Sequence, residues 1–375
     1  MPFELSDEEQ MIESMVAEFA RDQIGLEAAQ DVDRHDRFPE EAIQAAAALG
    51  LTGMTVGEGQ GGAGISSTAY ALAIERIARV CVNTATALAV HGLGLRLLAD
   101  GGHGAVTEAA AGGLLAVLST EEAHGSDKHT LGTEAIATDD GFRITGMKVW
   151  AINAAAAKHF LVLTRVPEQG PTWFLVPADA EGVALGQNEP LMGLRASGIR
   201  TVYLSGVEVP KDAQVGDVGA GAGMLARAMP WLHVGVAAAA TGATRGGFEA
   251  AQEFAASRVQ FGKPIGTYQA VSDTVTEVDV QCSAAHALTL QAAARLGHED
   301  AASSAARAKA FAVEMAIPMT RSNIRIQGGT GFMREGGTER FARDVRALQF
   351  VGEPIHMQRD VLKRSLLDIE FEAAP

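Results

Sequence analysis

The glycines and cysteines of this sequence are candidates for two kinds of site, a phosphate-binding loop and a metal or disulfide arrangement. The run GQGGAG at 59–64 has the composition of a phosphate-binding loop, but no strand pattern precedes it and no Lys-Ser or Lys-Thr pair follows it. We therefore predict a plain connector there. Cys81 and Cys282 have no metal-ligand spacing and make no disulfide framework, so no metal site is predicted.

Five further segments combine glycines with charged, hydroxyl and aromatic residues in a fixed order. They are STEEAHGSD (119–127), GMKVWAIN (146–153), LMGLRASGIRTVYLSGVEVP (191–210), SRVQFGKPIGTYQ (257–269) and IRIQGGTGFMREGGTERFARD (324–344). In this order they resemble the acyl-CoA dehydrogenase motifs T-E-P-x-x-G-S-D, G-x-K-x-W-I-T-N, G-L-R-x-S…V-x-V-P, R-x-x-F-G-x-x-I-x-x-x-Q and Q-x-x-G-G-x-G-Y…E-R…R-D. The resemblance spans most of the chain beyond its N-terminal helices.

The resemblance implies FAD bound between a β domain and a helical bundle. Thr120 matches the threonine at the flavin pyrimidine edge, and Ser126 matches a serine near the pyrophosphate and substrate. Trp150 matches the aromatic residue packed against the isoalloxazine. Two cofactor positions differ from the family pattern. Ile152 replaces a hydroxyl residue that contacts flavin N5, and Arg325 replaces a glutamine but can still hold a pyrophosphate.

The adenine and pyrophosphate side of FAD is expected to be held by residues of the bundle. Arg258, Phe261 and Gln269 match family residues that typically reach the cofactor from a neighbouring subunit. The pair Gly328-Gly329 matches the backbone turn beneath the dinucleotide. A guanidinium pairs bidentately with phosphate, and glycines permit close backbone approach. Taken singly, Phe261 fits a bundle core and Arg258 a solvated charge. As a set, they imply a homotetramer or homodimer.

The family's catalytic carboxylate is absent from its usual position. The family pattern R-D-x-x-x-x-x-x-x-E-G-T-x-x-x-x-R aligns without a gap with RDVRALQFVGEPIHMQR (343–359). This alignment places Gly352 at the base position and Glu353 at the adjoining glycine. Pro354 then replaces a threonine, and His356 replaces a polar residue near the flavin.

A minority of the family carries its glutamate on the first bundle helix, just before an arginine. Leu232 and His233 occupy those two positions here, so neither known site offers a carboxylate. The backbone N–H of Gly352 can still polarise a thioester carbonyl, whichever residue acts as base. The residues expected to contact the substrate are Ser126, His233, Gly352 and Glu353.

Three explanations of the missing base stay open. Glu353 serves as base after a one-residue shift of the loop that Pro354 causes, or it is simply a solvated carboxylate. A histidine supplies acid–base chemistry near neutral pH, the candidates being His91, His233 and His356. In the third explanation the chain is catalytically silent, as one subunit of a hetero-oligomer or as a flavoprotein for other chemistry.

The elements that must position these residues change character twice along the chain. Residues 1–113 show apolar spacing typical of helices, beginning with a capping box at Ser6 and Glu9. Residues 114–218 contain short β-rich runs bounded by turn residues, which predict a small, mostly antiparallel β-barrel. Residues 219–375 predict a four-helix bundle. Its helices are expected at 223–259, 265–297, 299–328 and 336–368.

Composition limits the classes of partner. The formal net charge is −16, from 46 acidic and 30 basic residues, and no basic stripe appears, so nucleic acid is not an expected partner. No apolar segment is long enough to span a membrane. The opening MPFELSDEEQ lacks the basic and apolar regions of a secretory signal, and a cytoplasmic location is expected.

The expected function is an FAD-dependent oxidoreductase that acts on an acyl thioester of CoA or of a carrier protein. The resemblance implies an electron-transfer flavoprotein or oxygen as electron acceptor. One alternative is a flavin monooxygenase-like enzyme acting on a substrate that is not a thioester. The other is a non-catalytic subunit that contributes half of a flavin site to an active paralogue.

Overall fold

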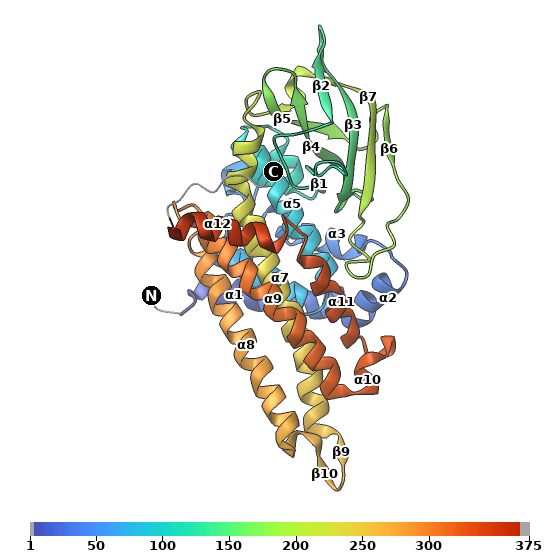
Figure 1. The fold of residues 1–375 in the computed structure, drawn as a ribbon, viewed down its shortest axis with the longest axis vertical. Helices are drawn as coiled ribbons and strands as arrows, with labels where there is room; N and C mark the ends of the chain where they lie inside the picture. The colour runs from blue at the N-terminus through green and yellow to red at the C-terminus, as the bar shows by residue number, and fades with distance from the viewer. Residues whose placement is uncertain (1–3, 368–375) are drawn as a thin grey trace.

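The computed structural model describes residues 4–367, so the first three and last eight residues of the two predicted terminal domains lie outside it. Helices, one sheet and helices again follow one another along the chain, as predicted (Figure 1). The first helices are α1 (Asp7–Phe19), α2 (Leu26–Arg34), α3 (Glu40–Ala48), α4 (Ser67–Ala78), α5 (Val82–Asp100) and α6 (Val106–Ala110).

The capping box predicted at the start of the chain is confirmed. The Ser6 hydroxyl accepts a hydrogen bond from the Glu9 N–H, and the Glu9 carboxylate accepts one from the Ser6 N–H, which is the predicted capping box. Gly50, just beyond α3, has a φ of 74°, in the left-handed region that favours glycine at a helix end. Within residues 4–367 no helix combines the length and apolarity needed to cross a bilayer.

The central segment forms one eight-stranded sheet. Its order is β6-β7-β3-β2-β4-β5-β8, and β1 pairs in parallel with β4. The sheet encloses its own apolar core of buried alanine, valine, leucine and phenylalanine side chains. Its strands are β1 (Leu115–Leu118), β2 (Glu134–Ala137), β3 (Gly141–Ala151), β4 (His159–Val166), β5 (Gly170–Pro177), β6 (Val183–Leu185), β7 (Arg200–Pro210) and β8 (Gln214–Val215).

The C-terminal helices extend away from the sheet. The 37-residue helix α7 is about 56 Å long at 1.5 Å per residue, and the short hairpin of β9 and β10 lies at its far end (Figure 1). The elements are α7 (Gly221–Ser257), β9 (Val259–Gln260), β10 (Lys263–Pro264), α8 (Gln269–Ala293), α9 (Ala301–Gln327), α10 (Gly329–Phe332), α11 (Thr338–Leu348) and α12 (Ile355–Leu367).

The prediction of one continuous helix over 336–368 is wrong. A turn separates α11 from α12, because Gly352 and Glu353 both have positive φ, 62° and 79°. Pro354 follows them and has no N–H to continue a helix. The chain therefore changes direction beside the sheet, where α5 and α7 also approach.

Glycines allow α7 to lie very close to α4. A methyl group at Gly242 would overlap the backbone carbonyl of Glu75, and one at Gly246 would overlap that of Arg79. A single apolar core therefore runs from the N-terminal helices through α7 into the bundle. The position of α7 is consequently set by backbone contact as well as by side chains.

We expect Gly242→Ala to destabilise the protein by roughly 1–3 kcal/mol, because the added methyl meets the Glu75 carbonyl. Gly223→Ala is the matched control on the same helix, since its added methyl has only the Arg227 guanidinium nearby, at 3.6 Å. The control should gain up to about 1 kcal/mol from helix propensity. Urea unfolding measures both free energies. Equal values for the two variants would contradict the close approach of α4 and α7.

Candidate functional site

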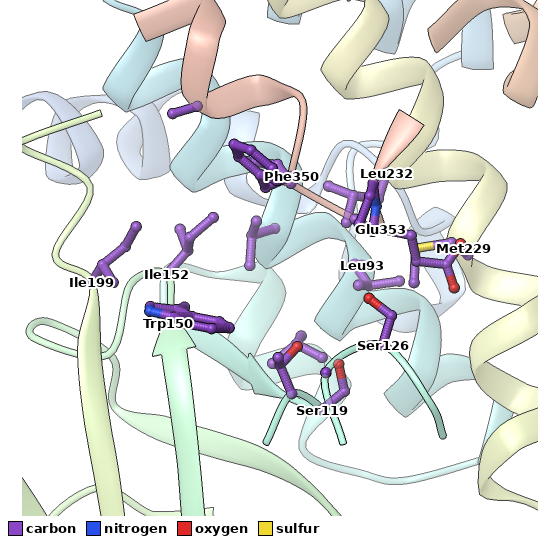
Figure 2. A pocket seen from close by; sticks show the side chains of 18 of the residues that line it. Leu93, Ser119, Ser126, Trp150, Ile152, Ile199, Met229, Leu232, Phe350 and Glu353 are labelled. Carbon is purple, nitrogen blue, oxygen red and sulfur yellow. The ribbon is translucent and has the colours of Figure 1, made fainter. Parts of the chain in front are cut away.

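A cavity of about 690 Å³ lies where the sheet, α5, α7 and the turn before α12 meet. Figure 2 shows Trp150 at the end of β3 on one side of this cavity and Phe350 on the opposite side. The lining is largely apolar. Predicted site residues that line it are Thr120, Ser126, Trp150, Ile152, Gly352, Glu353 and His356. Apolar residues that line it include Val90, Leu93, Val117, Ile199, Met229 and Leu232.

Trp150 is directed to the cavity by an irregularity in β3. The pairing of β3 with β7 shifts register between Lys148 and Ala151, and Trp150 has a φ of 52°. Positive φ is rare for a bulky residue, and bulges often redirect side chains beside functional sites. The Trp150 side chain remains 57% exposed. A flat, half-exposed aromatic surface on this wall suits a planar ligand.

The loop that carries Thr120 and Ser126 is held by a buried ion pair. The Lys148 ammonium donates to the Glu121 carboxylate at 2.7 Å, and both side chains are almost completely buried. The N–H groups of Gly132 and Thr133 also donate to Glu121, at 2.6 and 3.0 Å. Despite burial, these donors lower the pKa of Glu121 to about 2. The carboxylate therefore stays ionised and closes the loop upon itself.

Lys128 is a cavity residue that the sequence interpretation missed. Its ammonium donates to the Ser119 carbonyl at 3.0 Å and lines the cavity together with Glu353. Burial lowers the pKa of Lys128, and the negative charge of Glu353 opposes that shift. The cavity thus holds a partly desolvated cation close to its carboxylate.

Glu353 is the only carboxylate among the described residues that line the cavity. Burial raises the pKa of Glu353 above its ordinary value of 4.5, although Lys309 and Lys128 oppose the shift. Its carboxylate lies 3.8 Å from Nε2 of His233. A carboxylate with a raised pKa is a stronger proton acceptor when ionised, which suits a general base working near neutral pH.

The two positions at which the resemblance predicts a base adjoin each other. Leu232 on α7 and Gly352 on the turn both line the cavity. A Cβ added at Gly352 would lie 2.7 Å from Cδ2 of Leu232. Because of this close approach, a glutamate at 352 needs a shorter side chain at 232, and its backbone would also be strained by the positive φ. The structure thus places Leu232 in part of the space that a carboxylate would use.

The three candidate histidines lie in different surroundings. His91 is fully buried outside the cavity lining, accepts a hydrogen bond from the Leu115 N–H at 3.1 Å, and has its pKa lowered by burial to about 4. His233 does not line the cavity either, because its Nε2 donates to the Gly352 carbonyl at 2.6 Å from behind. A direct contact of His233 with substrate is therefore not supported. His356 is exposed and lines the cavity.

The other predicted cofactor residues lie outside the cavity. Arg258, Phe261 and Gln269 are at the end of α7, in the β9–β10 hairpin and at the start of α8, the end of the molecule away from the sheet (Figure 1). Arg325 is near the end of α9 and donates to Thr274 at 2.9 Å. Gly328 and Gly329 follow it, between α9 and α10.

These residues, which lie far from the cavity, form a surface suited to a ligand, with groups that have no partner among the described residues. The Phe261 ring is 93% exposed, and the Arg258 side chain has no ion pair or hydrogen bond within residues 4–367. A Cβ added at Gly328 or Gly329 would meet nothing within 4 Å. An unpaired cation, an exposed aromatic ring and open backbone can accept a nucleotide.

Comparison with known proteins gives matches over almost the whole chain. Three domain models of acyl-CoA dehydrogenase match: the N-terminal domain over residues 6–114, the middle domain over 116–207 and the C-terminal domain over 219–367. The Bacillus subtilis protein named "Probable acyl-CoA dehydrogenase YngJ" is 32% identical over 98% of this chain and 100% of its own.

Two further proteins agree with these matches. Cyclohex-1-ene-1-carbonyl-CoA dehydrogenase of Geobacter metallireducens is 31% identical, over 97% of this chain and 99% of its own. The solved butyryl-CoA dehydrogenase of Megasphaera elsdenii is 27% identical with a TM-score of 0.93, over 98% of this chain and 100% of that one. The similarity therefore extends through all three parts of the fold.

We expect Lys148→Met to destabilise the protein by about 3–5 kcal/mol, because Glu121 would stay buried without its cation. Lys158→Met is the matched control, since Lys158 pairs with Glu108 at the exposed surface, where a pair contributes about 0–1 kcal/mol. Urea unfolding at neutral pH measures both. Similar losses in the two variants would contradict a structural role for the buried pair.

The buried pair also gives an expected pH dependence. The pKa of Glu121 is about 2 in the folded protein, below its ordinary value of 4.5. Its stabilisation is therefore complete above about pH 4.5 and is lost as the pH falls through the folded value.

Proposed function

Since the chain belongs to the acyl-CoA dehydrogenase family, we propose that it is an FAD-dependent oxidoreductase acting on an acyl thioester of CoA or of a carrier protein. The observation that supports a reaction in this cavity is the presence of Glu353 as its one carboxylate, in a largely apolar lining, among the residues that the structure describes. We assign Glu353 as the base that removes the proton from the carbon next to the thioester carbonyl.

Different residues of the chain remove the proton, stabilise the developing charge and exclude water. The Glu353 carboxylate takes the α-proton, and its raised pKa helps it to do so near neutral pH. The N–H of Gly352 donates to the thioester oxygen and stabilises the charge that develops there. FAD, when bound, would supply the acceptor for the hydride that leaves the β-carbon. The apolar side chains of Leu93, Met229 and Leu232 exclude water from the acyl group.

The chain's residues fit the cofactor in two places. Around the cavity, the Trp150 surface and Thr120 suit the flavin ring, and Ser126 suits the pyrophosphate and the substrate. At the other end of the molecule, Arg258 and the exposed Phe261 suit its nucleotide half. Ile152 contributes only apolar contact to the first place, because its side chain has no donor.

One chain cannot supply both places to one cofactor. Leu232 at the cavity and Arg258 are 26 residues apart on α7 and its cap, which corresponds to about 39 Å along the helix. We therefore propose a homodimer or homotetramer in which the hairpin end of one copy completes the flavin site of another. An electron-transfer flavoprotein or oxygen would be the electron acceptor.

We expect Arg258→Ala to fold normally and to retain FAD much more weakly, because a phosphate would lose its bidentate partner. Arg227→Ala is the control, since Arg227 also lies exposed on α7 but pairs with Asp100 near the opposite end. The flavin-to-protein absorbance ratio after gel filtration measures retention. Full occupancy in Arg258→Ala would remove Arg258 from the cofactor site.

We expect Glu353→Gln to slow anaerobic flavin reduction by acyl-CoA about 10²–10⁴-fold, the usual effect of losing a general base. In the wild type, kcat/KM should rise with pH through a value above 4.5, because the pKa of Glu353 is raised. Glu299→Gln, an exposed carboxylate outside the cavity, is the control. A panel of acyl-CoAs of different lengths should be used, with flavin bleaching as the measurement.

One outcome would overturn the assignment of Glu353, and two further observations on the wild-type protein would favour the alternative functions. Rapid reduction that Glu353→Gln leaves unchanged would place the base elsewhere. A wild-type protein that binds flavin only when mixed with a second chain would favour the non-catalytic partner subunit. Flavin reoxidation coupled to oxygenation of a substrate that is not a thioester would instead favour the monooxygenase-like alternative.

A further inference from the structure

We propose that Lys309 is a positioning residue that fixes the turn between α11 and α12, and thereby aims the Glu353 side chain and two backbone N–H groups at the cavity. The role for catalysis rests on the function proposed above. The role in holding the turn does not, because it concerns backbone conformation alone.

The contacts of Lys309 are unusual for a helix lysine. Its side chain on α9 is completely buried, and its Nζ donates to the carbonyls of Val351 at 2.7 Å, Gly352 at 2.8 Å and Glu353. An ammonium group has three N–H donors, so three successive carbonyls use all of them. The charge is thus solvated by the backbone of the turn, and the turn is ordered by the charge.

The turn has a conformation that requires such support. Gly352 and Glu353 are successive residues with positive φ, and the second is a glutamate, for which this region is unfavourable. Three carbonyl dipoles also point towards one place, where they repel one another unless a cation lies between them. His233 adds a fourth donor, from Nε2 to the Gly352 carbonyl at 2.6 Å.

The same turn conformation directs the N–H groups of Gly352 and Glu353 away from Lys309. In a trans peptide the C=O and the N–H of the next residue point in opposite directions. The carbonyls of Val351 and Gly352 face Lys309 in the bundle, so the N–H groups of Gly352 and Glu353 face away from it. Neither N–H has a hydrogen-bond partner within residues 4–367. Both residues line the cavity, where a thioester oxygen would accept from them.

Lys309 also acts on the charge state of Glu353. Four groups from different elements face this carboxylate: Lys309 of α9, Lys128 of the loop after β1, His233 of α7 and Gln358 of α12. Burial and the charge of Lys309 lower the pKa of His233 well below its ordinary value, so it is neutral. The cations Lys309 and Lys128 limit how far burial raises the pKa of Glu353.

The test is Lys309→Met in the FAD-loaded protein, with Lys363→Met as control because Lys363 is exposed on α12. Amide hydrogen exchange should become about tenfold or more faster in a peptide covering 349–358, since several hydrogen bonds are lost, and should stay unchanged in peptides of α7 and α8. The ascending limb of the kcat/KM profile should also move to higher pH, because Glu353 loses a neighbouring cation.

Unchanged exchange at 349–358 in Lys309→Met would overturn the proposal. Should that variant not fold, Lys309→Gln and the wild type take its place. Burial lowers the pKa of Lys309 to about 7, and its neutral amine has only two donors. Exchange of this peptide in the wild type, corrected for the intrinsic rate, should therefore rise as the pH passes about 7. Unchanged exchange of this peptide in Lys309→Gln would equally contradict the proposal, because that side chain cannot donate to all three carbonyls.

The exchange and kinetic results separate two possible failures. Faster exchange in Lys309→Met together with full activity of Glu353→Gln would retain Lys309 as the support of the turn and reject Glu353 as base. Unchanged exchange together with an inactive Glu353→Gln would do the reverse. If the ascending limb of the kcat/KM profile shifts in Lys309→Met and disappears in Glu353→Gln, the roles proposed for Lys309 and for Glu353 are both supported.

Discussion

The buried ion pair between Lys148 and Glu121 is the interaction on which the strand side of the cavity depends. It joins β3 to the loop that follows β1, immediately before the bulge that directs Trp150 outward. The Val149 N–H donates to the Thr120 carbonyl at 3.0 Å, so the strand and the loop also meet through the backbone. The aromatic wall and the hydroxyl residues are therefore placed by this ion pair together with the backbone hydrogen bond beside it.

Each side of the cavity has a buried lysine and a carboxylate, but the lysine has a different partner on each side. On the strand side, Glu121 is surrounded by an ammonium and two N–H donors, which hold it ionised and immobile. On the bundle side, the lysine binds the backbone instead, and Glu353 is left with a raised pKa. Environments that separate the pKa values of two carboxylates commonly separate a structural role from an acid–base role.

Much of this arrangement could be predicted from sequence, because the motifs are local. The order of helices and strands and the cavity positions of Thr120, Trp150 and Gly352 followed from ordered patterns. Periodicity could not reveal the break between α11 and α12, because apolar spacing continues through both. Lys309 resembled an ordinary helix lysine, since only tertiary packing shows that it is buried. The identity of the base stays a prediction.

Lys148 and Glu121 show that sequence motifs can fix the positions of two residues without revealing that they pair. Both occupy fixed places in the motifs, so their positions carried a signal, but pairing between segments 27 residues apart was not inferred from it. Opposite charges in two neighbouring β-rich runs, each beside an apolar strand, were the available clue.

The uninterrupted helix α7 limits which insertions and deletions the sequence can accept during evolution. An α-helix advances 1.5 Å and turns about 100° per residue. One residue inserted between Leu232 and Gly242 would rotate the hairpin end by that angle relative to the cavity wall, while the glycines against α4 would leave their contacts. Insertions and deletions are consequently far better tolerated in the surface loops than along this helix, which keeps a fixed phase between its ends.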